Sequence, residues 1–546
     1  MKVSAQLSLC AFLILIFCLK FTFAQSDPFK TSTLSTLSKK NSSSQKIIQK
    51  NSKKDFNSLV KNENSQKLGI FDNQSDIGQN VKQGTTNFSQ KTNLYTVTGS
   101  GSNIWSNHDE FHFVWKKIKG DFILSTRASL VDTGFEPHRK LGWMVRASLD
   151  DNSPQICVAE HGDGLTALQF RRVKNGLTEE IRSELKSADI LQLERKGKVY
   201  TMRVARFGEP FVKIDFSDIE LGDEVYVGLF VCSHNAAKIE KGIFENVQIS
   251  VPFPGISNQG TSMSLGSNLE LLDIYSGKRE IVYSVSYSIQ APNWMIDGTH
   301  LIFNDYKGLL YNFDLDKRTT APINTGSINN NNNDHVLSFD GSQIGLSSDN
   351  KNLGGSTIYT VPIAGGDPKQ ITQNSPSYLH GWSPDGKDLV FCGSRDGEFD
   401  VYKIGSSGGK ELKLTNTKGL DDGPEYSPDG KYIYFNSVRS GLMQIWRMYP
   451  DGTNQEQITN DDFNNWFAHI SPDGKWMVYL SFLKEETEPG IHPPYKHVYI
   501  QLKSTLGGSS KVIAYVYGGQ GTINTPSWSP DSKRIAFVSN TVISKP

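Results

Sequence analysis

One ten-residue pattern recurs six times in the C-terminal half of this 546-residue chain. Aligned on an Asp-Gly pair, which is Asp-Ser in the last copy, the repeats read WMIDGTHLIF from Trp294, LSFDGSQIGL from Leu337, WSPDGKDLVF from Trp382, YSPDGKYIYF from Tyr426, ISPDGKWMVY from Ile470 and WSPDSKRIAF from Trp528. Their aspartates are separated by 43, 45, 44, 44 and 58 residues. A period of about 44 residues, filled with short alternating apolar runs, is typical of a β-propeller with one four-stranded blade per repeat.

Three of the repeats contain Pro-Asp-Gly, the turn chemistry that a blade needs. In Pro-Asp-Gly, proline fixes φ and glycine tolerates a positive φ, so a tight turn is predicted between the innermost strand and the second strand. Fifteen residues follow the last aspartate, Asp531, which is enough for two strands of the sixth blade. We expect the hairpin 269–283 to supply the two outer strands, because a ring closed by both ends of the domain exposes no strand edge.

These SPDGK repeats resemble the TolB-like, WD40-related six-bladed propellers of bacterial envelopes, and the resemblance covers residues 266–546. It implies the fold but does not single out one function. TolB-like propellers include protein-binding modules, lyases and the non-catalytic halves of peptidases.

The first 67 residues differ from the rest in composition. Residues 1–24 combine Lys2, an apolar run and small residues before Gln25, which is the pattern of a cleavable signal peptide. Residues 25–67 are rich in Ser, Lys, Asn and Gln, so we expect a disordered linker. The two segments hold 11 lysines and 3 acidic residues, and because the whole chain has zero net charge, the remainder is mildly acidic. We therefore expect a periplasmic or secreted protein with no nucleic-acid partner and no stable membrane insertion after signal cleavage.

Residues 68–251 form a second all-β segment, with about ten strand-like runs and no helical pattern. This number of strands at this size fits a two-sheet jelly-roll sandwich. The run EFHFVWKKIKGDFILSTRA from Glu110, followed by GWMVRASL and VYVGLFVCSHN, resembles concanavalin A-like domains of the lectin and glucanase type. The predicted fold is therefore all-β, a concanavalin A-like jelly-roll sandwich followed by a six-bladed propeller.

Side chains suited to sugar recognition are frequent in this second segment. Indole faces stack on the C–H groups of sugars, and polar side chains bind hydroxyl groups. In the strand 110–116, alternation places the three aromatic residues on one face, which we expect to be core, and His112 on the polar face that a ligand would use. The candidate residues are Trp105, His108, Asp109, His112, His138, Arg139, Trp143, Arg146, His161, Asp163 and Arg171.

The axial channel of the propeller is the second candidate site. The first strand of each blade lines this channel, so the residues shortly before each repeated aspartate should converge from six directions. The candidate ligand-binding residues are Asp334, His335, Tyr378, His380, Asp421, Asp422, Glu425, Asn465, Trp466, His469, Gln520 and Asn524.

The histidines and carboxylates of this set admit two interpretations. Neutral imidazole with carboxylate suits Zn, Mn or Fe, so His335, His380 and His469 are candidate ligands of a divalent metal. His380, Glu425 and His469 are then candidate catalytic residues. The alternative is a wet polar channel that binds a ligand without a metal. Oligogalacturonate lyases, which this propeller resembles, use a His-lined axial metal, but their clustered Gln and His motif is not visible here.

The chain also has an insertion in its last repeat and three cysteines beyond the predicted signal peptide. The polar, proline-rich segment 483–496 lengthens the last repeat and is predicted to be a loop over one face of the ring, with His492 and Tyr495 as further candidates. The expected mature chain keeps Cys157, Cys232 and Cys392, which have no metal-site spacing and are expected to be buried thiols.

Two functions fit these features. The first is an exported envelope or extracellular binding protein, with glycan on the sandwich and a protein or polymer on the propeller. The second is a carbohydrate-active enzyme, a polysaccharide lyase or hydrolase, that works in the His and carboxylate channel.

Overall fold

The computed structural model describes residues 68–134, 136–253 and 265–543. The predicted signal peptide 1–24 and linker 25–67 lie outside the described residues. The described chain is almost entirely β-structure, with one short 3-10 helix, η1 (Gln520–Thr522). Within these ranges, no helix combines the length and the apolar character needed to cross a membrane.

Residues 73–250 form two antiparallel sheets of seven strands each. The first sheet has the order β1 (Asn73–Ile77), β6 (Phe111–Lys119), β15 (Glu224–Cys232), β8 (Lys140–Arg146), β9 (Gln155–His161), β10 (Thr166–Arg171) and β11 (Glu179–Arg182). The second has the order β14 (Val212–Phe216), β13 (Val199–Ala205), β12 (Ile190–Lys196), β7 (Phe122–Leu130), β16 (Glu240–Ser250), β3 (Leu94–Gly99) and β2 (Thr85–Ser89). Apolar side chains of both sheets, such as Trp143 and Leu193, share one core cluster. The jelly-roll and concanavalin A-like assignments stay predictions from the sequence.

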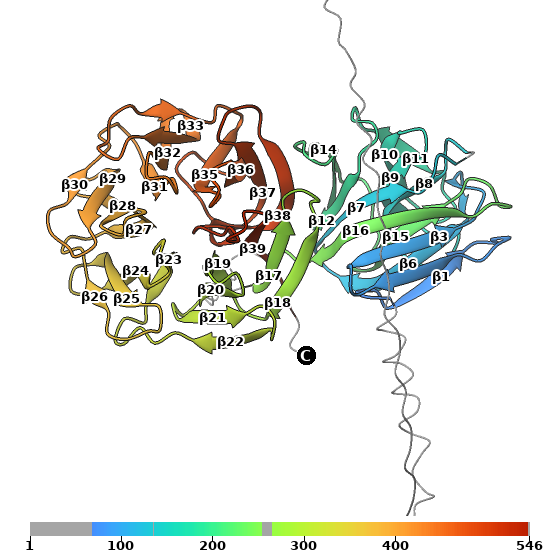
Figure 1. Ribbon diagram of the computed structural model, residues 1–546. Helices are drawn as coiled ribbons and strands as arrows, with labels where there is room; N and C mark the ends of the chain where they lie inside the picture. The colour runs from blue at the N-terminus through green and yellow to red at the C-terminus, as the bar shows by residue number, and fades with distance from the viewer. Residues whose placement is uncertain (1–67, 135, 254–264, 544–546) are drawn as a thin grey trace, which may run out of the picture. The chain divides into compact units, whose positions relative to one another are not determined.

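Six sheets form the predicted propeller and surround an axis in Figure 1, with β19, β23, β27, β31 and β35 innermost. Five blades have four strands in chain order. These are β19 (Ile289–Trp294), β20 (His300–Asp305), β21 (Leu310–Asp314) and β22 (Thr319–Pro322); β23 (Asn331–Leu337), β24 (Gln343–Asn350), β25 (Gly355–Pro362) and β26 (Lys369–Gln370); β27 (Ser377–Trp382), β28 (Asp388–Ser394), β29 (Phe399–Gly405) and β30 (Leu412–Lys413); β31 (Asp421–Tyr426), β32 (Ile433–Ser440), β33 (Leu442–Met448) and β34 (Glu456–Gln457); β35 (Phe463–Ile470), β36 (Trp476–Leu483), β37 (Pro494–Ser504) and β38 (Lys511–Gly519).

The sixth blade is assembled from both ends of the propeller, as the sequence predicted. β39 (Arg534–Thr541) pairs along its whole length with β17 (Gly266–Asp273), and β17 pairs with β18 (Arg279–Val285). On the axial side, Trp528 forms a single antiparallel bridge to Ile535 of β39. The hairpin β17–β18 therefore covers the edge that β39 would otherwise expose.

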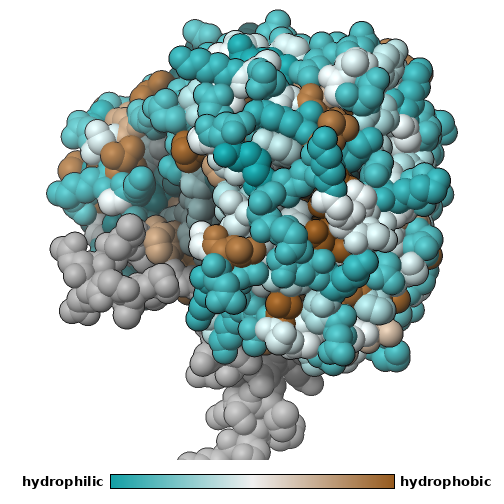
Figure 2. All heavy atoms as spheres, turned by 90° about the vertical axis from the view of Figure 1, so that its left-hand side faces the viewer, coloured by the Kyte–Doolittle hydropathy of each residue, from teal (hydrophilic) through white to brown (hydrophobic). Residues whose placement is uncertain are grey.

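The turn after each innermost strand is held by the repeat itself. In five blades the serine of the repeat donates its hydroxyl to the aspartate carboxylate, as in Ser383 to Asp385 and Ser427 to Asp429 at 2.7 and 2.6 Å. In the first blade Met295 replaces that serine. The side of the propeller that bears β25, β26, β29 and β30 is mostly hydrophilic, with isolated hydrophobic residues (Figure 2). The repeats thus fix the ring, whose innermost strands surround the axis.

Candidate functional site

The innermost strands are bulged, and the bulges decide which side chains face the axis. In β31 the pairing with β32 shifts between Asp422 and Glu425, and β19, β23, β27 and β35 have similar shifts. At three of these bulges one residue has a left-handed backbone: Ala291 (φ 57°), Gly423 (φ 58°) and Phe467 (φ 54°). An extra residue interrupts the two-residue alternation of a strand. Residues on both sides of the bulge can therefore face the channel.

A charged cluster lies where the innermost strands begin. Nε2 of His380 is 3.3 Å from Oδ1 of Asp422 and 4.0 Å from Oδ1 of Asp334. Nε2 of His492 is 3.8 Å from the other oxygen of Asp422. Asn524 donates a hydrogen bond of 2.7 Å to Asp334. We call Asp334, His380, Asp422 and His492 the polar cluster; it brings together residues from three innermost strands and the inserted loop.

Burial and neighbouring charges set the protonation of the polar cluster. Burial alone would lower the pKa of His380, but its hydrogen bond to Asp422 and the charge of Asp334 raise it. Burial alone would raise the pKa of Asp422, but the hydrogen bond from His380 holds the pKa of that carboxyl below its usual range. The pKa of Asp334 is raised by burial, which the attraction of His380 only partly offsets. His380 and Asp422 form an ion pair, whereas the negative charge of Asp334 is only partly balanced by His380.

Aromatic rings enclose the polar cluster. The ring of His380 stacks on Phe467 with centroids 5.9 Å apart, and His492 packs against Trp466 at 4.4 Å and Phe467 at 5.5 Å. Phe467 adopts its positive φ in this position, and a non-glycine residue in the left-handed region carries strain. The inserted loop thus brings His492 to the polar cluster, whereas the predicted loop residue Tyr495 lies in β37, where its hydroxyl accepts from the amide of Leu265 at 3.2 Å.

Tyr378 and Gln520 lie at the edge of the polar cluster. Both are half-buried, and burial raises the pKa of Tyr378, as do the charges of Asp334 and Asp422. Nε2 of Gln520 is 3.5 Å from Oδ1 of Asn333 on β23. These side chains are therefore the part of the predicted site that solvent reaches.

Other predicted site residues face elsewhere. Asp421 is buried and forms an ion pair of 2.9 Å with Arg439. Asn465 donates to Asp461 and Gln444, and its oxygen accepts from Ser481. His335 lies between the side-chain oxygens of Asn293 and Asn304, at 3.2 and 3.3 Å. These contacts join strands and blades, so the three side chains are occupied in holding the ring.

His469 and Glu425 form a separate pair further along the channel. Nδ1 of His469 is 2.6 Å from Oε2 of Glu425, and its Nε2 is 2.6 Å from the carbonyl oxygen of Ile523. Among the described residues no group of three or more His, Cys, Asp or Glu side chains is arranged to hold a metal ion. His335, His380 and His469 each have different partners, so the structure does not bring the predicted metal ligands to one centre.

The opposite end of the channel carries residues that the sequence analysis did not assign. The first residue of each repeat, six in all, lines a cavity of about 420 Å³ together with Asn293, Glu425 and prolines of the turns. We call this circle of six side chains the aromatic ring, after the four aromatic residues among them. Its members are Trp294, Leu337, Trp382, Tyr426, Ile470 and Trp528. Their recurrence at one position of the repeat was the signal that could have identified them.

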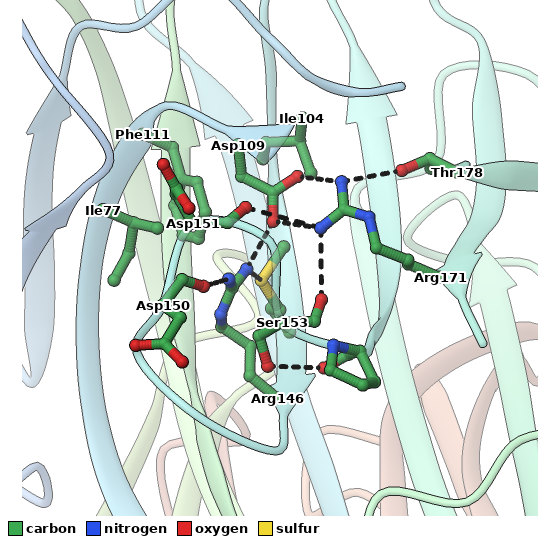
Figure 3. Close-up of polar contacts among 12 residues, drawn as sticks. Ile77, Ile104, Asp109, Phe111, Arg146, Asp150, Asp151, Ser153, Arg171 and Thr178 are labelled. Atoms are coloured by element: carbon green, nitrogen blue, oxygen red, sulfur yellow. Dashed lines mark hydrogen bonds and ion pairs between the residues drawn. The ribbon is translucent and has the colours of Figure 1, made fainter. Parts of the chain in front are cut away.

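Most candidate sugar-binding residues of the two-sheet region are buried. Both oxygens of Asp109 bind Arg171, at 2.6 and 2.9 Å, and Oδ2 also accepts from Arg146 at 2.8 Å (Figure 3). Trp143 lies in the core, and His112 is held by Asp76 at 2.7 Å. The aromatic face of β6 is covered as predicted, in a small cluster with Ile104. The exposed candidates are Trp105, His108, His138 and Asp163.

The three cysteines of the described chain are buried and unpaired, as expected. Burial raises the pKa of Cys157 to about 12 and of Cys232 to about 11. Neither thiol is therefore poised for nucleophilic chemistry.

Comparison with known proteins supports the propeller assignment. The model of the TolB beta propeller domain matches residues 380–491. An uncharacterised protein of Agrobacterium fabrum is 42% identical over 280 residues, which is 51% of this chain and 94% of that protein. A solved structure from Agrobacterium tumefaciens, provisionally assigned as a TolB, is 41% identical and wholly covered by 51% of this chain, with a TM-score of 0.49. TolB from Acinetobacter baumannii is 19% identical over 48% of this chain and 66% of its own, with a TM-score of 0.37.

The fold defines a six-bladed β-propeller. About half of this chain aligns with nearly the whole length of the Agrobacterium fabrum relative, and residues 380–491 match the propeller domain. The chain therefore belongs to the TolB β-propeller family.

Proposed function

We propose that this protein is an extracytoplasmic binding protein, periplasmic or secreted, that holds a protein partner at the polar cluster of its propeller channel. Membership of the TolB β-propeller family supports the binding role. The signal-peptide pattern of residues 1–24 supports the location. The observation that carries the proposal is that His380 pairs with Asp422 and leaves the negative charge of the neighbouring Asp334 only partly balanced.

The chemistry of the polar cluster indicates what it would recognise. Asp334 lies 4.0 Å from His380, beyond hydrogen-bond distance, and its side-chain hydrogen bond comes from the neutral amide of Asn524. A buried carboxylate gains most from a donor that carries positive charge. A lysine or arginine side chain of a partner, inserted past Tyr378 and Gln520, would supply that donor.

Site-specific photocrosslinking tests this proposal. We would place a photoreactive phenylalanine at Gln520, beside the polar cluster, and at exposed Leu412 in β30 as the control position. Envelope extract should yield one discrete adduct at position 520 that is absent at position 412. The adduct should be lost in Asp334→Asn and Asp422→Asn and retained in Lys410→Gln. An adduct that survives both carboxylate variants would refute recognition by this cluster.

An enzyme is the second candidate function. The raised pKa of His380, caused by the adjacent carboxylates against the effect of burial, gives it the character of a general acid. A polysaccharide lyase or hydrolase would then lose turnover in His380→Ala while binding is kept. Incubating wild type with uronic-acid polysaccharides and measuring new reducing ends or unsaturated products tests this function; the absence of product in wild type would exclude it for those substrates.

Glycan binding by the two-sheet region is a further part of the proposal. Trp105, which is 36% exposed, and its neighbour His108 offer a ring face and a polar group on the β4 (Ile104–Trp105) to β5 (His108–Asp109) hairpin. A glycan array of wild type beside Trp105→Ala tests it. Signals that do not differ between the two proteins would contradict a site on this hairpin.

A further inference from the structure

The aromatic ring lines a cavity on the propeller axis that is distinct from the polar cluster. Asp334 and Asp422 precede the ring residues Leu337 and Tyr426 by three and four positions in the same innermost strands. The polar cluster and the aromatic ring therefore occupy successive levels along the same innermost strands. The cavity therefore opens at the end of the ring where the Asp-Gly turns lie.

The walls of this cavity are fixed by hydrogen bonds between blades. Nε1 of Trp382 donates to the carbonyl oxygen of Val336 at 3.0 Å, and Nε1 of Trp528 donates to that of His469 at 2.9 Å. The N–H group of each indole is thus hydrogen-bonded to the neighbouring blade, and the apolar surface of the indole is left to line the cavity. A preformed apolar pocket of about 300 to 1,000 Å³ is typical of binding sites, and this cavity has about 420 Å³.

The floor of the cavity is polar but carries no net charge. Glu425 lies in the lining and is paired with His469, whose Nε2 must donate to the carbonyl oxygen of Ile523. The contact between Nδ1 and the carboxylate requires a second proton, held either by Nδ1 or by Glu425. In both cases the net charge of the pair is zero. The cavity is therefore suited to a large uncharged side chain and not to an anion or cation.

The rim of the cavity is asymmetric. Four repeats have proline before the aspartate and lysine two positions after it, whereas the first two have Ile296 with Thr299 and Phe339 with Ser342. Ile296 and Phe339 are 60% and 42% exposed and both line the cavity. A Cβ added to Gly341 would meet Ile296 at 2.7 Å, so Ile296 lies against the turn that follows Phe339. Ile296 and Phe339, which stand where the other repeats have proline, therefore form one apolar patch.

The same part of the rim is acidic. Lys387 and Lys475 neutralise the turn aspartates of their blades at 2.9 and 3.2 Å. Asp340 has serine in place of that lysine, and across the described ranges it forms no ion pair. The hydroxyl of Ser338 and the bonds from Ser342 lower the pKa of Asp340, so it is ionised at neutral pH.

We propose that this end of the propeller binds a peptide segment of a protein partner through one large apolar side chain in the aromatic ring and an adjacent lysine or arginine over Asp340. A small molecule enclosed in the cavity would leave the exposed Ile296 and Phe339 uncovered, whereas a peptide backbone crossing the rim would cover them. The charge of Asp340 selects a basic residue next to the apolar one. This site does not depend on the polar cluster.

Titrating 5-fluorotryptophan-labelled full chain by ¹⁹F NMR tests the proposal. The probes are Ac-Ala-Trp-Lys-Ala-NH2, its Glu and Ala counterparts Ac-Ala-Trp-Glu-Ala-NH2 and Ac-Ala-Ala-Lys-Ala-NH2, and N-acetyltryptophanamide. The Trp-Lys peptide should saturably shift the signals of Trp294, Trp382 and Trp528 and leave that of Trp143 unchanged. Replacing Trp by Ala should weaken binding at least about tenfold, and replacing Lys by Glu about threefold.

Variants separate the parts of the site. Asp340→Asn keeps the oxygen that accepts the turn hydrogen bonds and should equalise the Lys and Glu peptides. Phe339→Asp, at an exposed position that tolerates substitution, should weaken the peptides more than N-acetyltryptophanamide. Leu337→Arg should abolish binding of every probe, and Leu177→Asp, 70% exposed in the two-sheet region, should change nothing.

Two results would overturn the proposal. Failure of the Trp-Lys peptide to shift the ring signals of a folded protein would remove the site. Binding of N-acetyltryptophanamide as tight as that of the peptide, with no effect of Phe339→Asp, would make the cavity a small-molecule pocket and exclude the peptide.

Discussion

Nδ1 of His469 lies 2.6 Å from Oε2 of Glu425 while Nε2 of the same ring lies 2.6 Å from the carbonyl oxygen of Ile523. A carbonyl accepts only, so Nε2 carries a proton, and the contact to Glu425 needs another. The backbone amide of Ile470 donates to the second oxygen of Glu425 at 3.3 Å. The pair therefore links three blades as a neutral, fully bonded unit.

Glu425→Gln should preserve this unit, because the amide can donate to the neutral imidazole and its oxygen can still accept from Ile470. We expect its free energy of unfolding to stay within about 1 kcal/mol of wild type. Glu425→Ala and His469→Ala leave a buried polar partner and should each cost about 1–3 kcal/mol. Urea denaturation followed by tryptophan fluorescence measures the difference, with Glu456→Ala as the surface control. A loss in the Gln variant equal to that in the Ala variant would mean that the pair must be ionic.

The repeat predicted the ring and its closure because both follow from periodicity and from the cost of a free strand edge. The ten strands predicted in residues 68–251 all coincide with observed strands. The strands that were missed include β1, β11, β14 and β2, which are the four edges of the two sheets. Edge strands have one unpaired side and carry short, polar sequences, so periodicity gives them little signal.

The candidate site was harder to predict than the fold. Counting back from the aspartate found Asp334, His380 and Asp422 but also selected Asp421, which binds Arg439. The reason is the bulge in each innermost strand, since one extra residue changes which side chains face the axis. The aromatic ring was not assigned because apolar residues next to a turn are ordinarily core. Only the convergence of six copies on one cavity distinguishes them.

The pH dependence of stability should reveal the buried imidazole of His335. Burial lowers its pKa to about 3 from its ordinary value of 6.5. Between these values the unfolded chain binds one more proton than the folded chain, so stability falls as the pH falls. The contribution is about 1.4 kcal/mol per pH unit at most.

His335→Gln removes this titration and should flatten the loss of stability between about pH 6 and pH 4. Urea midpoints across this range check it, with exposed His138→Gln as the control that keeps the wild-type slope. An unchanged slope in His335→Gln would show that the folded protein protonates His335 as readily as the unfolded chain does.

The buried ion triad of the two-sheet region predicts a large effect from a small change. Asp109, Arg146 and Arg171 have fully buried side chains, and one carboxylate serves both guanidinium groups. Asp109→Asn leaves two buried cations without an anion and should cost about 3–5 kcal/mol. Asp150→Asn disrupts an exposed pair with Lys174 and should cost at most about 1 kcal/mol. Thermal unfolding followed by near-UV circular dichroism compares the two; equal midpoints would contradict the structural role of the triad.

Closure of the sixth blade predicts that the hairpin β17–β18 is indispensable. Leu269 is buried and packs with Val538 of β39 across the β17–β39 pairing. Deleting residues 265–286 would expose the full edge of β39, and an exposed edge templates association between chains. We expect the deleted protein to aggregate, as measured by light scattering and size-exclusion chromatography.

Leu269→Ala tests the same contact without changing the connection. It should keep the protein monodisperse and lower its free energy of unfolding by about 2–5 kcal/mol, because a cavity forms against β39. Ile281→Ala on β18, 42% exposed, is the matched control and should cost less than about 1 kcal/mol. A soluble deletion variant that still unfolds in one cooperative transition would show that the ring closes without the hairpin, and the pairing of β17 with β39 would then be dispensable for the fold.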